Sequence, residues 1–230
     1  MTGYGQFCAV ARAHEALGGR WTLLVVRELL CGSRRFNDIR RGIPRISRTM
    51  LAERLRDLVR LGAAIREEGP QGPEYRLTEA GGELAGLIGA FAAWGQRWLP
   101  RRAAEEDVES GPLLVDMQRR VRLSALPKEP LVVRVEIAGE VARFLLLKAS
   151  ESAFCLANPG FPEPLRLRAP LPALVAWWRG DASFAEAGRA GLRLDGPRAL
   201  VRAFPGWFDR YAFAGIVPAQ PPGPAAGPAP

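Results

Sequence analysis

Cysteine, histidine and lysine are scarce in this chain of 230 residues, which holds three, one and two of them. Zinc centres and most nucleophile–base pairs draw on several Cys or His side chains, and no Cys-x-x-Cys or His-Glu-x-x-His pattern occurs. On an ideal helix Cys8 and His14 lie about 240° apart around the axis, so they do not share a face. We therefore expect no metal, no cofactor and no Cys/His catalytic pair.

Long hydrophobic runs are also missing. No stretch approaches the roughly 18 consecutive apolar residues that a membrane span requires. The first 19 residues lack the basic segment, apolar core and cleavage site of a signal peptide, so we expect a cytoplasmic protein that does not enter a membrane. No phosphate-binding loop or nucleophile elbow is present, and we predict that the protein is not an enzyme.

Positive charge is concentrated in the first half of the chain. Residues 1–104 contain 17 arginines against 10 acidic residues, whereas residues 105–230 are nearly neutral. Within residues 33–62 nine arginines face three acidic residues. A basic cluster of this kind attracts polyanions, so double-stranded DNA is the expected partner, although a chain so rich in arginine owes part of the cluster to composition.

The pattern over residues 8–62 predicts four short helices. Gly18-Gly19 and Gly32 end the first two, and Ser33 is expected to cap the third, which ends near Pro44. Ser47 is expected to cap the fourth, which runs to Gly62 along one apolar stripe of Met50, Leu51, Leu55, Leu58 and Leu61. Two short helices joined by a tight turn, with arginines on the outer side of the second, indicate a helix-turn-helix.

A β-hairpin and a long helix follow. The runs AAIREE and EYRLT flank the turn-forming residues 69–73 and predict two strands, which would form a wing. A helix is then expected from Thr78 through Trp98, with an apolar stripe that is either core or a dimer seam.

Residues 7–98 resemble the HxlR family of winged-helix transcription regulators. The resemblance is carried by Cys8, the Gly-Gly-Arg-Trp opening, Arg-Arg-Phe-Asn, Leu-x-x-Arg-Leu-x-x-Leu and Tyr-Arg-Leu-Thr. It implies a homodimer that binds an inverted repeat. Many members have Pro after the cysteine, where this chain has Ala9, which affects the local geometry around the thiol.

The second half of the chain predicts a different kind of unit. Alternating residues from Val133 onward, the runs VARFLLLK, SAFCLA and LRLRA, and two helices after residue 170 indicate strands and helices with a mainly antiparallel sheet. A last helix is expected from Pro197 to about Tyr211, interrupted by Pro205. Residues 130–212 resemble the sterol carrier protein type 2 fold, through NPGF, the Leu-x-x-Leu-x-x-Trp-x-x-Gly segment that ends at Gly180, and LDGPRALVRAFPGWF. That resemblance implies a sensor of an apolar or amphipathic small molecule.

The predicted fold class is thus α+β in two domains. We expect a winged helix-turn-helix domain over 1–104, a linker with a helix over 105–129, a sterol-carrier-like domain over 130–217, and a disordered Pro/Gly/Ala tail over 218–230.

The predicted DNA-binding residues follow from the helix-turn-helix and the wing. We assign phosphate contacts to Arg34 and Arg35, and a backbone or minor-groove contact to Arg66 or Arg76. Glu53 has an intrahelical pair with Arg56 or Arg60 as its alternative role. The full set is Arg34, Arg35, Arg45, Ser47, Arg48, Thr49, Glu53, Arg56, Arg66 and Arg76, of which Ser47, Arg48, Thr49 and Glu53 lie nearest the base edges.

Two further groups of residues are candidates for sensing. Cys8 is a candidate redox or electrophile sensor, because some HxlR-type regulators use a cysteine at this position, and its alternative is a structural thiol. An apolar ligand pocket is predicted from a set that would otherwise fill the core, namely Phe144, Leu146, Phe154, Trp177, Trp178 and Phe184.

The sequence therefore predicts a ligand-responsive DNA-binding regulator that binds a pseudo-palindromic operator as a homodimer. The main alternative is a redox-responsive repressor that uses Cys8, with a structural C-terminal domain. A C-terminal domain that serves only dimerisation also stays open.

Overall fold

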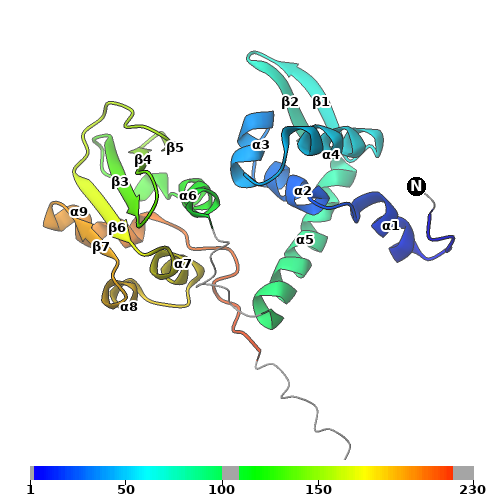
Figure 1. Ribbon diagram of the computed structural model, residues 1–230. Helices are drawn as coiled ribbons and strands as arrows, with labels where there is room; N and C mark the ends of the chain where they lie inside the picture. Colours follow the sequence, from blue (N-terminus) through cyan, green and yellow to red (C-terminus); the bar gives the residue numbers. More distant parts are fainter. Residues whose placement is uncertain (1–2, 100–108, 220–230) are drawn as a thin grey trace, which may run out of the picture. The chain divides into compact units, whose positions relative to one another are not determined.

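The computed structural model describes residues 3–99 and 109–219. The connector predicted around residues 100–108 and the tail predicted from residue 220 onward lie outside these ranges. The chain forms two compact units that divide between Ala90 and Phe91, within one continuous helix. Figure 1 shows the helices and strands of each unit.

The first unit has four short helices, a hairpin and the start of a long helix. Its helices are α1 (Ala9–Leu17), α2 (Thr22–Leu30), α3 (Phe36–Gly42) and α4 (Arg48–Arg60). The hairpin pairs β1 (Ala64–Gly69) with β2 (Gly72–Leu77), and α5 spans Glu79–Trp98. These bounds confirm the order of elements that the sequence predicts for a winged helix-turn-helix.

Apolar side chains from α2, α3, α4 and the start of β1 form the first core. Val25, Ile39, Leu51 and Leu55 are fully buried in it. The long helix packs closely against the end of the wing next to α4. A Cβ atom at Gly81 would lie only 1.9 Å from the carbonyl oxygen of Ala63. A glycine at this position therefore permits the approach of α5.

The predicted cap of the third helix is wrong. The helix begins at Phe36 instead of directly after Ser33, and the hydroxyl of Ser33 is turned inward toward the buried Glu28 carboxylate, at 3.5 Å. The reason is tertiary: the backbone N–H of Tyr75 donates to the carbonyl of Arg34 at 2.8 Å, and Arg35 forms a β-bridge with Glu74. Residues 34 and 35 are thereby extended against the wing and do not enter the helix.

The second unit is built on a five-stranded sheet. Its strands are β3 (Leu131–Ile137), β4 (Arg143–Lys148), β5 (Glu151–Cys155), β6 (Leu165–Ala169) and β7 (Arg193–Asp195), in the order β5-β4-β3-β6-β7. The pairing of β3 with β6 is parallel and the other three pairings are antiparallel. The mainly antiparallel α+β layout is therefore confirmed.

Helices contribute to a core on one face of this sheet. They are α6 (Ser110–Arg119), α7 (Leu171–Arg179), α8 (Phe184–Arg189) and α9 (Arg198–Ala203), with short 3₁₀ turns at Leu123–Ala125 and Phe204–Trp207. Leu114 and Met117 of α6 are fully buried, so this part of the segment predicted as linker and helix packs with the second unit. The last helix ends earlier than predicted, because the chain tightens into the 3₁₀ turn that contains Pro205. In the described ranges no helix has both the length and the apolar character to cross a bilayer.

Candidate DNA-binding surface

The N-terminus of α4 presents polar side chains and backbone N–H groups to solvent. Ser47 caps the helix, and its hydroxyl oxygen accepts a hydrogen bond from the backbone N–H of Met50 at 3.1 Å, as predicted. The side chains of Arg45, Ser47, Arg48 and Thr49 are all exposed. Backbone N–H groups in the first turn of a helix bind phosphate well, because they lack intrahelical acceptors and lie at the positive end of the helix dipole.

The outer face of α4 carries the cations most available to a polyanion. Leu51, Leu55 and Leu58 are buried on the inner face, so the opposite face is solvated. Arg48 and Arg56 are exposed and form no ion pair with any residue in the described ranges, and the Nε of Arg56 donates to the carbonyl of Ala52 at 3.3 Å. These two guanidinium groups retain charge that no carboxylate of residues 3–99 or 109–219 neutralises.

Glu53 lies on the same face but is already engaged. Its carboxylate pairs with Arg54 at 2.5 Å, and Arg54 also contacts Asp57 at 2.9 Å. The sequence predicts an intrahelical pair of Glu53 with Arg56 or Arg60, whereas the structure pairs it with Arg54. Arg60 pairs with Asp57 instead, and Arg56 donates to the backbone. Base contact by Glu53 would require this pair to open.

Arg35 holds the wing. Its Nε lies 3.3 Å from Glu74 Oε1, and a terminal amino group donates to the side-chain oxygen of Gln71. Arg34, its neighbour, is exposed and acts electrostatically on Glu67. Of the two residues predicted to contact phosphate, the structure thus places Arg34 on the surface and ties Arg35 to the hairpin.

The arginines of the wing itself are paired with carboxylates. Arg66 lies 2.7 Å from Glu68, and the Nε of Arg76 donates to Glu67 at 2.8 Å. This pairing lowers the pKa of Glu67 and raises the pKa of Arg76, chiefly through the side-chain hydrogen bond between them. The wing offers less uncompensated positive charge than its arginines alone indicate.

Sequence reasoning missed Glu28, a buried carboxylate beneath this surface. Glu28 is 1% exposed and receives hydrogen bonds from the Nε and a terminal nitrogen of Arg27, at 3.2 and 2.7 Å. Arg27 also donates to the carbonyl of Gly42 at 3.1 Å, which joins α2 to the end of α3 just before the turn into α4. The signal in the sequence is an acidic residue inside the apolar run TLLVVRELL.

Cys8 lies at the N-terminal end of α1 and is partly exposed. The backbone N–H groups of Ala11 and then Val10 lower the pKa of its thiol below the ordinary value. A helix N-terminus stabilises a thiolate for the same reason that it binds anions. In the described part of the chain, no three His, Cys, Asp or Glu side chains gather in a way that could hold a metal ion.

The six residues predicted to line an apolar pocket do not share one lining. Phe144 and Leu146 belong to a small cluster with Val132, whereas Phe154 pairs in register with Leu145 and packs against the helix-covered core. The two groups therefore lie on opposite faces of the sheet, because successive strand residues point to opposite sides.

The aromatic members of the set fill the core of the second unit. Trp177 and Trp178 are each 2% exposed, and the ring of Trp177 lies 5.1 Å from that of Phe184 and 6.0 Å from that of Phe204, between centroids. Trp178 donates its indole N–H to Asp116 at 2.8 Å. Rings at these distances contact each other and do not enclose space.

The first unit has the architecture of a winged helix-turn-helix protein. A capped second helix with a cationic outer face follows a short first helix and a tight turn, and a two-stranded wing comes next. Proteins of this class place the second helix in the major groove of DNA.

Comparisons with known proteins identify the family. Residues 16–103 match the model of the HxlR-like helix-turn-helix family. The chain is 37% identical over 91 residues to YvaP, an uncharacterized HTH-type transcriptional regulator of Bacillus subtilis, and the match covers 38% of this chain and 84% of YvaP. The chain therefore belongs to the HxlR-like helix-turn-helix family.

Other relatives show how much of the chain is matched. An uncharacterized HTH-type transcriptional regulator of Mycobacterium tuberculosis is 46% identical over 96 residues, which is 40% of this chain and 60% of that protein. The chain thus spans 60% of the length of this mycobacterial relative. The crystal structure of the reduced form of YodB from B. subtilis is 35% identical, covers 40% of this chain and 93% of YodB, and has a TM-score of 0.36.

Proposed function

We propose that this protein is a DNA-binding transcriptional regulator that binds a pseudo-palindromic operator as a homodimer. The observation that carries the proposal is the N-terminal end of α4, where Ser47 caps an exposed helix start and Arg48 has no carboxylate partner among the described residues. In this arrangement the helix enters the major groove, the helix start and Arg34 contact phosphates, and Arg48 and Thr49 lie nearest the base edges.

An unpartnered apolar face supports the homodimer. Along α5, Leu84 and Ile88 pack into the first core, whereas Leu87, Phe91 and Trp94 are 50%, 65% and 55% exposed. Trp98, one further turn along, is 47% exposed. The predicted stripe is thus divided between core and a large apolar surface, and such surfaces mark protein interfaces. In a two-fold dimer the recognition helices would enter major grooves about 34 Å apart.

The test begins with selection of operator sequences from random duplexes, followed by anisotropy measurements on the selected duplex. Affinity is expected to fall with salt with a log–log slope of about −5 to −9, given three to five phosphate contacts in each half. Arg48→Ala should weaken binding by about 1 to 3 kcal/mol in each half-site if Arg48 reads a base.

The matched control is Arg41→Ala, because Arg41 is exposed in the same unit but is paired with Asp38 at 3.0 Å. This variant should bind the operator like the unmodified protein. Equal losses in both variants would show that binding follows total charge and not the α4 surface. Selection that enriches no sequence would overturn the proposal itself.

The second unit is proposed to have a sterol-carrier-like fold and to sense a small molecule, which the sequence predicts to be apolar. The resemblance in residues 130–212 and the mainly antiparallel sheet covered by helices support this part of the proposal. Because the predicted aromatic lining is packed, an apolar ligand would have to displace core side chains. Native mass spectrometry of protein purified without detergent tests it: a dimer that carries a discrete apolar molecule supports the proposal, and unchanged operator affinity with that molecule at saturation removes it.

A redox-responsive repressor is the second candidate, and the lowered pKa of the Cys8 thiol favours it. A thiolate is the form that oxidants and electrophiles attack, so a lowered pKa increases its reactivity near neutral pH. If Cys8 is the sensor, diamide should release the protein from its operator, and Cys8→Ser should abolish that release. Release that persists in Cys8→Ser excludes this function.

A further inference from the structure

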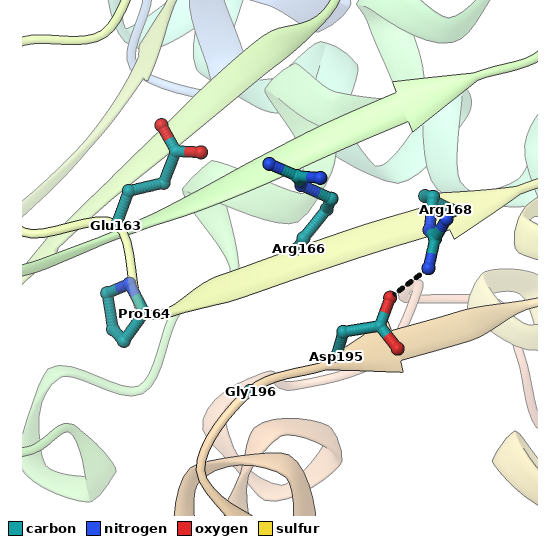
Figure 2. A pocket seen from close by; sticks show the side chains of 6 residues that line it. All are labelled: Glu163, Pro164, Arg166, Arg168, Asp195 and Gly196. Carbon is teal, nitrogen blue, oxygen red and sulfur yellow. Dashed lines mark hydrogen bonds and ion pairs between the residues drawn. The ribbon is translucent and has the colours of Figure 1, made fainter.

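The face of the second sheet that points away from the helix-covered core is divided into an apolar half and a charged half. Over β4 and β5, Phe144 and Leu146 pack with Ala153 and Phe161. Over β6 and β7 the outward side chains are charged instead. A hollow of about 330 Å³ lies on this charged half, and its lining consists of Glu163, Pro164, Arg166, Arg168, Asp195 and Gly196 (Figure 2).

The ion pairs around the hollow leave one guanidinium incompletely engaged. Asp195 lies directly opposite Arg166 in the register of β6 and β7, yet its carboxylate pairs with Arg168 at 2.5 Å. Glu136 accepts a hydrogen bond from Arg134 at 2.6 Å and lies 3.9 Å from the Nε of Arg166. Glu163, which also lines the hollow, accepts a hydrogen bond from Asn158 at 2.8 Å and lies 3.8 Å from a terminal nitrogen of Arg134. The terminal amino groups of Arg166 make no hydrogen bond to any residue that the structure describes.

The neighbourhood of Arg166 adds to its attraction for an anion. Its register partner on β3 is Arg134, which pairs with Glu136 at 2.6 Å and lies 3.8 Å from Glu163, so the nearest carboxylates are engaged mainly by Arg134. The side chain of Arg166 is 50% exposed, and in Figure 2 its guanidinium lies between the side chains of Glu163 and Arg168. An anion bound here would complete the donor set of Arg166.

A glycine keeps one wall of the hollow free of a side chain. Gly196 has a φ of +149°, a conformation that L side chains rarely adopt. A Cβ atom at this position would lie 2.4 Å from the carbonyl oxygen of Pro164. The close approach of the two chain segments therefore requires glycine, and the backbone itself forms the wall.

We propose that this hollow binds a small monocarboxylate that carries a hydroxyl or ammonium donor beside the carboxylate group. The planar fork of Arg166 matches a carboxylate, with which it forms two parallel hydrogen bonds. Glu163 and Asp195 at the rim repel a second negative charge and accept a hydrogen bond from the donor. The same rim disfavours the dianionic form of inorganic phosphate, although an isolated arginine fork fits both groups.

This site lies within the second unit, and its occupation does not depend on DNA. It deepens the proposed function by assigning a polar ligand to the sensing unit, at a place other than the packed aromatic core. Its test is therefore a binding measurement on the full chain without DNA, so that failure of the ligand site and failure of operator binding are separate results.

The experiment follows two-dimensional ¹H–¹⁵N spectra, including arginine Nε–H signals, during titration with four probes. L-lactate and L-serine have a carboxylate and a neighbouring donor, propionate has only the carboxylate, and inorganic phosphate is the dianion. We expect saturable shifts at β6 and β7 with dissociation constants on the order of 1 mM for the first two probes, and weaker binding of the others.

Two variants identify the residue that binds. Arg166→Gln keeps a polar side chain with an N–H donor but removes the charge and the fork, and should weaken binding at least about tenfold. Arg189→Gln alters an arginine on α8 whose side chain is 74% exposed, and should leave binding unchanged. The proposal fails if no probe gives saturable shifts, if Arg166→Gln binds as well as the unmodified protein, or if phosphate binds more tightly than lactate and serine.

Discussion

The buried carboxylate of Glu28 fills the space beside Gly42, so a side chain at position 42 should destabilise the helix-turn-helix. A Cβ atom at Gly42 would lie 2.0 Å from Glu28 Oε2, so Gly42→Ala forces the buried carboxylate and its partners to move. Overpacking of this kind costs about 1 to 3 kcal/mol. We expect Gly42→Ala to destabilise the first unit by that amount, although alanine is the better helix former.

Glu28→Ala removes the carboxylate and leaves Arg27 without its buried acceptor. Breaking a fully buried ion pair costs about 3 to 5 kcal/mol. The side chain of Arg27 is 40% exposed and regains water, so a loss of about 2 to 3 kcal/mol is expected here. In the Glu28→Ala background the Cβ atom of Gly42→Ala enters vacated space, and the second substitution should then be neutral or stabilising by up to about 0.5 kcal/mol.

The assay is a double-mutant cycle read from amide hydrogen exchange in α2 and α4, which reports the first unit alone even when the second unit unfolds separately. The expected coupling between the two substitutions is about 1 to 3.5 kcal/mol. Additive costs would refute the reasoning, because they would mean that the added methyl group and the carboxylate do not compete for the same space.

Three further predictions concern single side chains. Ser47→Ala removes the cap of α4 and should destabilise the first unit by about 1 kcal/mol, measured by the same exchange experiment. Trp178→Phe deletes the indole hydrogen bond to Asp116 and should lower the unfolding free energy of the second unit by about 1 kcal/mol in urea denaturation, because a partly buried acceptor loses one donor and keeps its ion pair with Arg120. Glu186 accepts hydrogen bonds from the hydroxyl and the backbone N–H of Ser183, which lower its pKa. The stability that this capping box contributes is therefore present above the ordinary pKa of a glutamate and is lost as the pH falls through the lowered pKa of Glu186. Acid titration of α8 exchange should show that loss in the unmodified protein and not in Glu186→Gln.

The sequence predicted correctly those helices and turns that depend on interactions between residues close together in the chain. The stripe that contains Leu51, Leu55 and Leu58 and the cap at Ser47 together specify α4, because helix periodicity and capping act within a few residues. The turn-rich segment between β1 and β2 likewise predicts the hairpin from its own composition.

The structure differs from the sequence-based prediction where a segment distant in the chain determines the local conformation. Ser33 has the chemistry of a helix cap, but the wing, some 40 residues later, pairs with residues 34 and 35 and extends them. The apolar pocket predicted from the sequence differs from the structure for the same reason. The sequence shows that Phe144 and Leu146 share a face of the sheet, but the packing of α6 and α7 decides which face the helices cover. Neither outcome is encoded within a short window.

The number of arginines in the sequence likewise does not show how many of them are free to bind DNA. The sequence counts nine arginines in residues 33–62, but the structure pairs Arg35, Arg41, Arg54 and Arg60 with carboxylates. An arginine held by a carboxylate releases few counterions when DNA binds, because its charge is already compensated and its pair must first be broken. Arg34→Ala, which removes one proposed phosphate contact from each half of the dimer, should therefore reduce the salt slope of operator binding by about 2, and Arg76→Ala, which frees the carboxylate of Glu67 on the wing, should change it less. A larger change for Arg76→Ala would mean that its pair with Glu67 opens on DNA and that the wing binds phosphate directly.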